Sequence, residues 1–103
     1  MIHVIAVIEV QPGTREAFLN EFNNIVPEVQ REPGCIEYGA TIDLKTDIQR
    51  QAPLRENVVT IVEKWEDVAA LEAHLNAPHM ATYREHVKEF VVSGKLHILQ
   101  PMS

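Results

Sequence analysis

The run from residue 2 to residue 10 is expected to form a strand that is apolar on both faces. It is rich in β-branched side chains, which favour extended backbone. Side chains alternate between the two faces of a strand. The apolar residues are Ile5 and Val7 on one face and Val4, Ala6 and Ile8 on the other. A sheet face open to water should instead alternate apolar with polar residues, so this strand must be covered from both sides.

A long amphipathic helix is expected after this strand. Apolar residues recur at the three-and-four spacing of one helical face between Thr14 and Val29. Thr14 is placed to act as the N-cap. Pro27 lacks a backbone N–H and crowds the preceding turn, so a kink or a split is predicted there. The run Glu32-Pro33-Gly34 ends the helix.

The second half of the chain contains further strand and helix patterns. Residues 35–44 and 58–65 are predicted strands. The polar connector 45–57 between them is long for a hairpin, and it would be a lid, a partner contact or a plain solvated loop. Asp67 is expected to cap a short helix, and Pro78 either ends that helix or starts the next one.

The order of these elements predicts the fold class. A helix over residues 79–91 and a last strand over residues 96–99, after Gly94, complete the pattern. The order is typical of an α+β ferredoxin-like split βαβ sandwich, a four-stranded antiparallel sheet with helices on one face only. Since the first strand is apolar on both faces, a second copy should cover the open sheet face. We predict a single domain over residues 1–103 that forms a homodimer.

Composition limits the partners of the chain. The formal net charge is −6, and the sequence has no cluster of Lys and Arg residues that could bind along a phosphate backbone, so nucleic-acid binding is not expected. No segment approaches the roughly 18 apolar residues of a membrane span, and no basic leader precedes an apolar run. Cys35 is the only cysteine, which excludes an intrachain disulfide. These features favour a cytoplasmic protein.

Histidine and glycine spacing argues against a metal or a nucleotide cofactor. Two histidines that bind zinc from one helix normally lie four residues apart. His79 and His86 are seven apart, which is roughly 10 Å along a helix and too far to share one ion by themselves. The four glycines are isolated from one another, so no phosphate loop or dinucleotide fingerprint is present.

Several polar and aromatic side chains are expected to border the core. On a helical wheel, His79, Tyr83, His86 and Phe90 fall close to one stripe beside the apolar face that bears Met80. Taken singly, Tyr83 reads as a packing residue and each histidine as a rim residue. Together they suggest a site.

An acidic residue interrupts the apolar pattern of the strand 58–65. Glu63 and Trp65 leave the same face of that strand, which otherwise contains mostly valine and isoleucine. The carboxylate therefore either binds something polar or pairs with a cation such as Lys64 or Arg84.

A set of short motifs carries a family resemblance that runs from end to end of the chain. The motifs are Pro33-Gly34-Cys35, Glu63-x-Trp65-Glu66, Leu71-Glu72-Ala73-His74-Leu75, Pro78-His79-Met80 and Ile98-Leu99-Gln100-Pro101. The chain resembles the antibiotic biosynthesis monooxygenase superfamily of ferredoxin-like dimers, and within it the bacterial quinol monooxygenases. The Glu-x-Trp and His-Leu-x-x-Pro-His pieces mark the superfamily, whereas the connector and the tail favour the quinol branch.

The resemblance implies oxidation of a quinol or a related aromatic phenol by molecular oxygen, without flavin, haem or metal. The haem-degrading branch carries Asn, Trp and His where this chain has Ala6, His74 and Arg84, which disfavours haem degradation. A relative that isomerises a phosphorylated sugar shares His74 and His79. A proton-shuttling isomerase and a non-catalytic ligand-binding dimer therefore remain as alternatives.

Elementary proton chemistry is compatible with the quinol reading. A histidine with a pKa near 6.5 that removes a proton from a phenol with a pKa of about 10 works uphill by about 5 kcal/mol. The quinolate can then reduce oxygen directly, so the protein needs to position a base, exclude water and stabilise the anion. The catalytic candidates are His74, His79 and Tyr83, with either histidine as the base. The substrate-binding candidates are Glu63, Trp65, Met80, Arg84 and Phe90.

Overall fold

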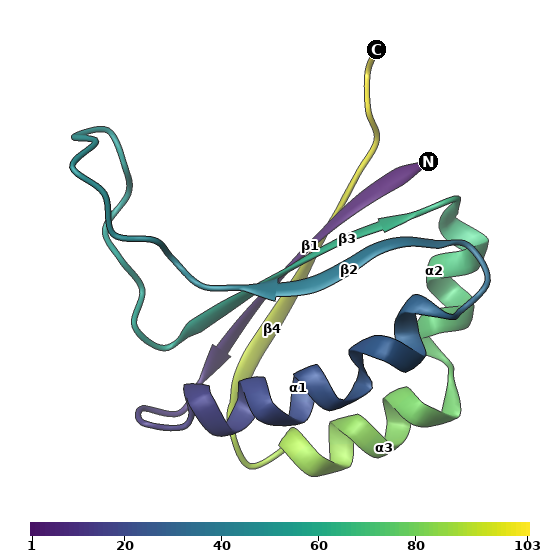
Figure 1. Ribbon diagram of the computed structural model, residues 1–103, viewed down its shortest axis with the longest axis horizontal. Coiled ribbons are helices and arrows are strands. Elements are labelled where there is room, and N and C mark those ends of the chain that lie inside the picture. Colours follow the sequence, from purple (N-terminus) through teal and green to yellow (C-terminus); the bar gives the residue numbers. More distant parts are fainter.

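Four strands form one antiparallel sheet in the order β2-β3-β1-β4 in the computed structural model, which describes residues 1–103 (Figure 1). The strands are β1 (Ile2–Val10), β2 (Cys35–Thr41), β3 (Val58–Trp65) and β4 (Val91–Leu99). The helices are α1 (Arg15–Gln30), α2 (Val68–Leu75) and α3 (Pro78–Val87), and they lie on one face of the sheet. The predicted ferredoxin-like α+β fold is confirmed. None of the helices has the length and hydropathy needed to cross a membrane.

The two central strands of the sheet, β3 and β1, have one face that the helices cover and one face that is open. On β1, Val4 and Ala6 point toward the helices and are almost fully buried. On the opposite face Ile5 pairs with Val62 of β3, and these two side chains and Val7 are only half-buried. The open face therefore keeps an apolar centre that the helices of the same chain do not cover.

The helices bury a mainly aromatic and aliphatic core against the sheet. The buried side chains of the helices include Phe18, Phe22 and Val29 of α1, Leu71 and His74 of α2, and Met80, Tyr83 and Val87 of α3. Helix α1 runs through Pro27 as one element, so the predicted split does not occur. Pro78 starts α3 and does not end α2, because its fixed φ suits the first turn of a helix and its missing N–H is not needed there.

Two predicted caps have different outcomes. Asp67 caps α2, since its Oδ1 accepts a hydrogen bond from the backbone N–H of Ala70 at 2.8 Å. Thr14 precedes α1 but makes no side-chain cap, because its hydroxyl donates to the carbonyl oxygen of Gln11 at 2.7 Å. The hydroxyl thus stabilises the turn that leads into α1 and accepts no hydrogen bond from the N–H groups of the first helical turn.

The predicted helix over residues 79–91 is too long. Helix α3 ends at Val87, and a turn closes with a hydrogen bond from the N–H of Phe90 to the carbonyl of Val87. Strand β4 begins at Val91 and contains Gly94, because pairing with β1 gives these backbone groups ladder hydrogen bonds. The predicted strand 35–44 is also too long, since its pairing with β3 ends at Thr41.

The connector between β2 and β3 projects beyond the ends of these two strands (Figure 1). Asp43 and Arg55 tie its two ends together, with Nη2 of Arg55 2.8 Å from Oδ1 and Nε 3.0 Å from Oδ2. The backbone N–H of Arg55 also donates to Oδ2 at 2.9 Å. The ion pair and these hydrogen bonds give the connector a fixed base.

Candidate functional site

One carboxylate, that of Glu32, joins two of the predicted site histidines. Its Oε2 lies 2.9 Å from Nδ1 of His74 and 2.8 Å from Nε2 of His79. The side chain of His74 is only 2 % exposed, that of Glu32 11 % and that of His79 18 %. The three groups form a contact that extends from the core toward the surface between α1 and α3.

Local backbone features bring these three residues together from separate elements. Gly34 has a φ of +84°, and a Cβ built at this position would lie 2.6 Å from the Cβ of Ala70 in α2. The turn that carries Glu32 can therefore approach α2 only because residue 34 is glycine. The carbonyl oxygen of Gly34 also accepts a hydrogen bond from the backbone N–H of Glu66 at 2.8 Å. His74 in the last turn of α2 and His79 in the first turn of α3 then flank the carboxylate.

His74 is held as a neutral imidazole with one nitrogen engaged. Burial lowers the pKa of His74, and the hydrogen bond to Glu32 opposes that shift. The ring centroid lies 4.7 Å from that of Trp65 and 5.2 Å from that of Tyr38, so aromatic rings form its surroundings. The structure gives His74 a single hydrogen bond, through Nδ1. A neutral ring that donates from Nδ1 has its lone pair on Nε2, which is the arrangement of a general base with an orienting carboxylate.

His79 differs because both of its ring nitrogens face carboxylates. Its Nδ1 is 3.1 Å from Oε2 of Glu28, and its Nε2 is 2.8 Å from Oε2 of Glu32. Of these two contacts, only the one between Nε2 and Glu32 has the geometry of a hydrogen bond. The contact between Nδ1 and Glu28 is a charge contact with a side chain that is 55 % exposed, so His79 is less enclosed than His74.

Glu63 is a buried acid that pairs with an aromatic neighbour. Its Oε1 accepts a hydrogen bond from the indole N–H of Trp65 at 2.9 Å. Burial raises the pKa of Glu63 to about 7, against the effect of that hydrogen bond, and the charge of Glu32 adds to the rise. The expected cation partners do not contact it, because Lys64 pairs with Glu37 and Arg84 donates to a backbone carbonyl.

The other predicted residues divide between the core and the surface. Tyr83 is buried with its ring edge-on to Phe18 and Phe22, and burial raises the pKa of its phenol. Met80 is also buried, whereas Arg84 is exposed and bonds to the carbonyl of Leu75. The predicted stripe is only partly right. His86 lies at the rim, 3.4 Å from Glu21, and Phe90 lies in the turn after α3, where it is half-buried.

Three residues of this cluster are absent from the sequence prediction. Glu28 and Glu32 lie four residues apart in and just after the last turn of α1, where the helix dipole disfavours acids, and that turn contains no basic residue. That unfavourable placement is the signal that would have identified them. Tyr38 is buried beside His74, and burial and Glu63 raise its pKa. As one tyrosine in a strand, it carried no distinguishing pattern.

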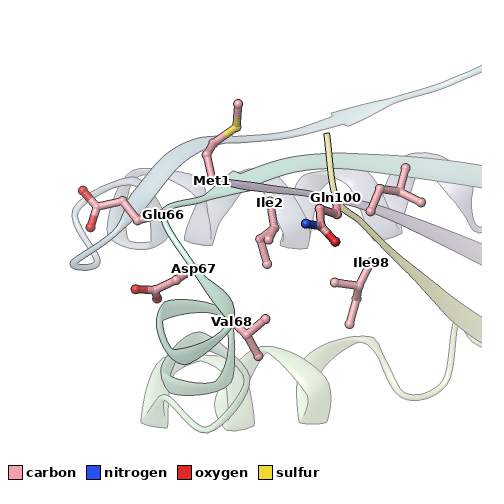
Figure 2. Close-up of a pocket in the computed structure, with 8 residues that line it drawn as sticks. Met1, Ile2, Glu66, Asp67, Val68, Ile98 and Gln100 are labelled. Atoms are coloured by element: carbon pink, nitrogen blue, oxygen red, sulfur yellow. The ribbon is translucent and has the colours of Figure 1, made fainter. Parts of the chain in front are cut away.

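Two surface clefts lie near or beside these residues. A groove of about 350 Å³ between α1 and α3 is lined by Glu28, His79, Tyr83 and His86, among others. A second cleft, of about 500 Å³, lies between the start of α2 and the ends of β1 and β4 (Figure 2). Figure 2 shows Ile2, Val68 and Ile98 pointing into this second cleft. It contains no predicted site residue, so the α1–α3 groove is the better candidate.

The described side chains include no cluster of three or more His, Cys, Asp or Glu residues that is arranged to hold a metal ion. Glu32, His74 and His79 have the right chemical type, but the two imidazoles already meet the carboxylate directly through hydrogen bonds.

Comparisons with known proteins agree on one family. The family model described as antibiotic biosynthesis monooxygenase matches residues 1–86. The Escherichia coli K12 protein named "Probable quinol monooxygenase YgiN" is 42% identical over 103 residues, which covers 98% of each chain. The structure of PA3566 from Pseudomonas aeruginosa has a TM-score of 0.80 at 25% identity and covers 99% of this chain and 94% of that one. Rv0793 from Mycobacterium tuberculosis shares the fold, with a TM-score of 0.80 at 21% identity and coverage of 99% and 95%.

Proposed function

The chain belongs to the antibiotic biosynthesis monooxygenase family, and from this premise we propose that it oxidises a quinol or a related aromatic phenol with molecular oxygen. The name of the Escherichia coli relative supports a quinol as the substrate class. The observation that carries the proposal is the buried imidazole of His74, which Glu32 orients through Nδ1.

In this proposal His74 is the base. Its Nε2 takes the proton of a quinol hydroxyl, and Glu32 stabilises the imidazolium that results. The quinolate then reduces oxygen. One oxygen atom is added to the ring carbon and the other leaves as water, so that quinol and oxygen give a hydroxyquinone and water without another reductant. His74 returns its proton to the departing oxygen, and the side chain is ready for another cycle.

The surroundings of His74 suit this task. Burial disfavours the charged ring and so adds to the cost of proton transfer, which is about 5 kcal/mol for an unassisted histidine, and the hydrogen bond to Glu32 offsets part of that addition. Trp65 and Tyr38 provide aromatic surfaces beside the ring and limit the access of water. We place substrate entry at the α1–α3 groove, whose wall includes Tyr83 and His79. The volume of about 350 Å³ falls at the small end of the range for organic-ligand pockets.

The phosphorylated-sugar isomerase receives less support. A phosphate would need a local basic patch, and the two nearby cations, one in α3 and one directly after it, are already engaged. Arg84 donates to the carbonyl oxygen of Leu75 at 2.6 Å, and Lys88 pairs with Glu85 at 3.3 Å.

We also propose that two copies associate through the open sheet face. The apolar centre formed by Ile5, Val7 and Val62 supports this, because the helices of the same chain leave it half-buried. Light scattering after size exclusion should give twice the mass of 11.7 kDa, and Val7→Lys should give a folded monomer. A monomeric wild type would contradict the proposal.

Oxygen uptake with a panel of quinols, menadiol included, tests the activity. We expect the wild type to accelerate uptake and His74→Gln to lose about 100-fold or more in kcat/KM, the usual effect of removing a general base. Glu85→Gln, on the exposed side of α3, is the matched control and should match the wild type. Absence of stimulation by the wild type with every quinol would contradict the proposed reaction. Equal rates for wild type and folded His74→Gln would contradict the assignment of the base.

A further inference from the structure

We propose that Glu63 determines which ligands the site accepts. As an undissociated acid, it donates a hydrogen bond to the second oxygen of a quinol, the oxygen opposite the hydroxyl that His74 deprotonates. For the class of ligand this inference rests on the proposed quinol oxidation. The hydrogen bond itself can be tested with a quinone, which binds without being turned over.

Glu63 lies in the same cluster of side chains as His74. Its Oε1 accepts the indole N–H of Trp65 at 2.9 Å, and the ring centroids of Trp65 and His74 lie 4.7 Å apart. Glu63 also pairs directly with Tyr38 across β3 and β2, and the ring centroids of Tyr38 and His74 lie 5.2 Å apart. The carboxyl group and the imidazole therefore share two aromatic neighbours from the buried face of the sheet.

Polar atoms of this cluster are free to meet a ligand. The second carboxyl oxygen of Glu63, Nε2 of His74 and the hydroxyl of Tyr38 make no hydrogen bond within the protein. Every side-chain nitrogen or oxygen that is shut off from solvent does have a partner, so solvent must reach these three atoms, although none of the residues is more than 6 % exposed. A few convergent polar atoms in an apolar wall are typical of a small-molecule site.

Tyr83 connects this cluster to the surface. It lines the groove between α1 and α3, and its ring lies edge-on to Phe22, which in turn stacks on Tyr38 at 5.2 Å. Burial raises the pKa of both phenols, and the charge of Glu63 adds to each rise, so the carboxyl group lies within electrostatic reach of both. The groove therefore offers a route from solvent to the cluster.

The surroundings of Glu63 favour its acid form below pH 7. Burial raises its pKa to about 7 despite the hydrogen bond from Trp65, and the charge of Glu32, after α1, adds to the rise. From β1 it faces only the apolar Val4. The remaining ionisable neighbours are uncharged at neutral pH, because burial raises the pKa of three and lowers that of the imidazole: they are Cys35 and Tyr38 of β2, Tyr83 of α3 and His74 of α2.

An acid in this position selects a ligand by the placement of its oxygens. A protonated carboxyl group can accept through one oxygen and donate through the other, whereas an ionised one only accepts. Since Trp65 donates to Oε1 of Glu63, the other oxygen presents the O–H to the ligand. A quinol or quinone has a second oxygen at the opposite end of its ring, and this oxygen can accept that hydrogen bond. A phenol with a single hydroxyl would leave the acid without a partner.

Binding of duroquinone, measured by equilibrium dialysis at pH 6 and pH 8.5, tests the contact. This quinone has no titratable group and no free ring carbon for attack by the thiol of Cys35. For the wild type the dissociation constant should rise about tenfold or more between the two pH values, because ionised Glu63 repels the quinone carbonyl.

Glu63→Gln should remove this dependence on pH. Its amide oxygen keeps the hydrogen bond from Trp65 and its NH₂ group donates at both pH values, so the dissociation constant should change by less than about twofold. Glu66→Gln is the matched control, because it removes an exposed carboxylate just beyond the same strand. It should keep the pH dependence of the wild type.

The outcomes separate this proposal from the proposed activity. An equal loss of affinity with pH in the wild type and in folded Glu63→Gln would overturn the role of Glu63, even in an active enzyme. The wild type alone also decides, since no binding of duroquinone, or binding that does not weaken by pH 8.5, would overturn it whether or not the variant folds. A wild type that binds as expected but takes up no oxygen with any quinol would contradict the activity and leave the contact supported.

Discussion

Replacement of Glu63 by Gln should change how the stability of the protein depends on pH. Glu63 is 4 % exposed, and the pKa of its carboxyl group is raised from 4.5 to about 7, mainly by burial. A raised acid pKa means that the folded state holds a proton that the unfolded state has already released. Stability therefore falls as the pH rises through this window, and the loss is complete above the folded pKa.

The size of the effect follows from the shift. About 2.5 pKa units correspond to about 3 kcal/mol of unfolding free energy between pH 4.5 and pH 8. Gln is neutral throughout, and its amide oxygen can still accept the indole N–H of Trp65. Glu63→Gln should therefore remove most of this pH dependence and be more stable than the wild type at pH 8.

Urea unfolding at pH 5 and pH 8, followed by the fluorescence of Trp65 and at one protein concentration, measures this difference. The comparison is made between wild type and variant at each pH, so the contribution of His74 cancels. His74 has a lowered pKa and adds stability that is lost as the pH falls, which is the opposite sign. If the two proteins lost the same free energy between pH 5 and pH 8, Glu63 would not carry the assigned burial penalty.

Two further predictions concern the backbone and the connector. Gly34→Ala should lower the unfolding free energy by more than about 2 kcal/mol, because residue 34 has a positive φ and the added Cβ would clash with α2. Gly13→Ala is the control: its φ is +81° but the space around it is open, so the loss should be only about 1 kcal/mol. Equal losses in chemical unfolding would argue against the close approach at Gly34. Asp43→Asn should speed proteolytic cleavage within residues 42–57 at pH 7 and leave the core uncut, because hydrogen bonds from Arg55 to Asp43 hold the connector in the wild type. The same hydrogen bonds lower the pKa of Asp43 to about 2. In the wild type this contribution is present above the ordinary pKa of Asp and is lost as the pH falls toward 2. Unchanged cleavage would show that the ion pair does not restrain the connector.

The sequence predicted the fold well because its strongest patterns are those that packing also satisfies. The apolar period of α1 and the strand over residues 58–65 occur where they were expected. The errors lie at ends of elements, where sheet pairing overrides local propensity. Val91 continues a helical pattern but pairs with Val10, and residues 42–44 have strand composition but no partner strand.

The candidate site was predictable only in part. The histidines and Glu63 were recognisable as unusual residues, but their roles depend on which atoms they contact. Glu32 joins residues more than 40 positions away, and no local pattern shows that one of its oxygens meets two imidazoles. The role proposed for His74 follows from the contact at its Nδ1, which sequence spacing does not provide.

The central claim, that His74 removes a proton from a bound quinol, is tested most directly without oxygen. Menadiol mixed anaerobically with an excess of the wild-type protein should develop the red-shifted absorption of the quinolate at neutral pH. The same mixture with folded His74→Gln should retain the spectrum of the neutral quinol. Absence of the quinolate band with wild type that binds menadiol, or a band of equal size with His74→Gln, would contradict the account.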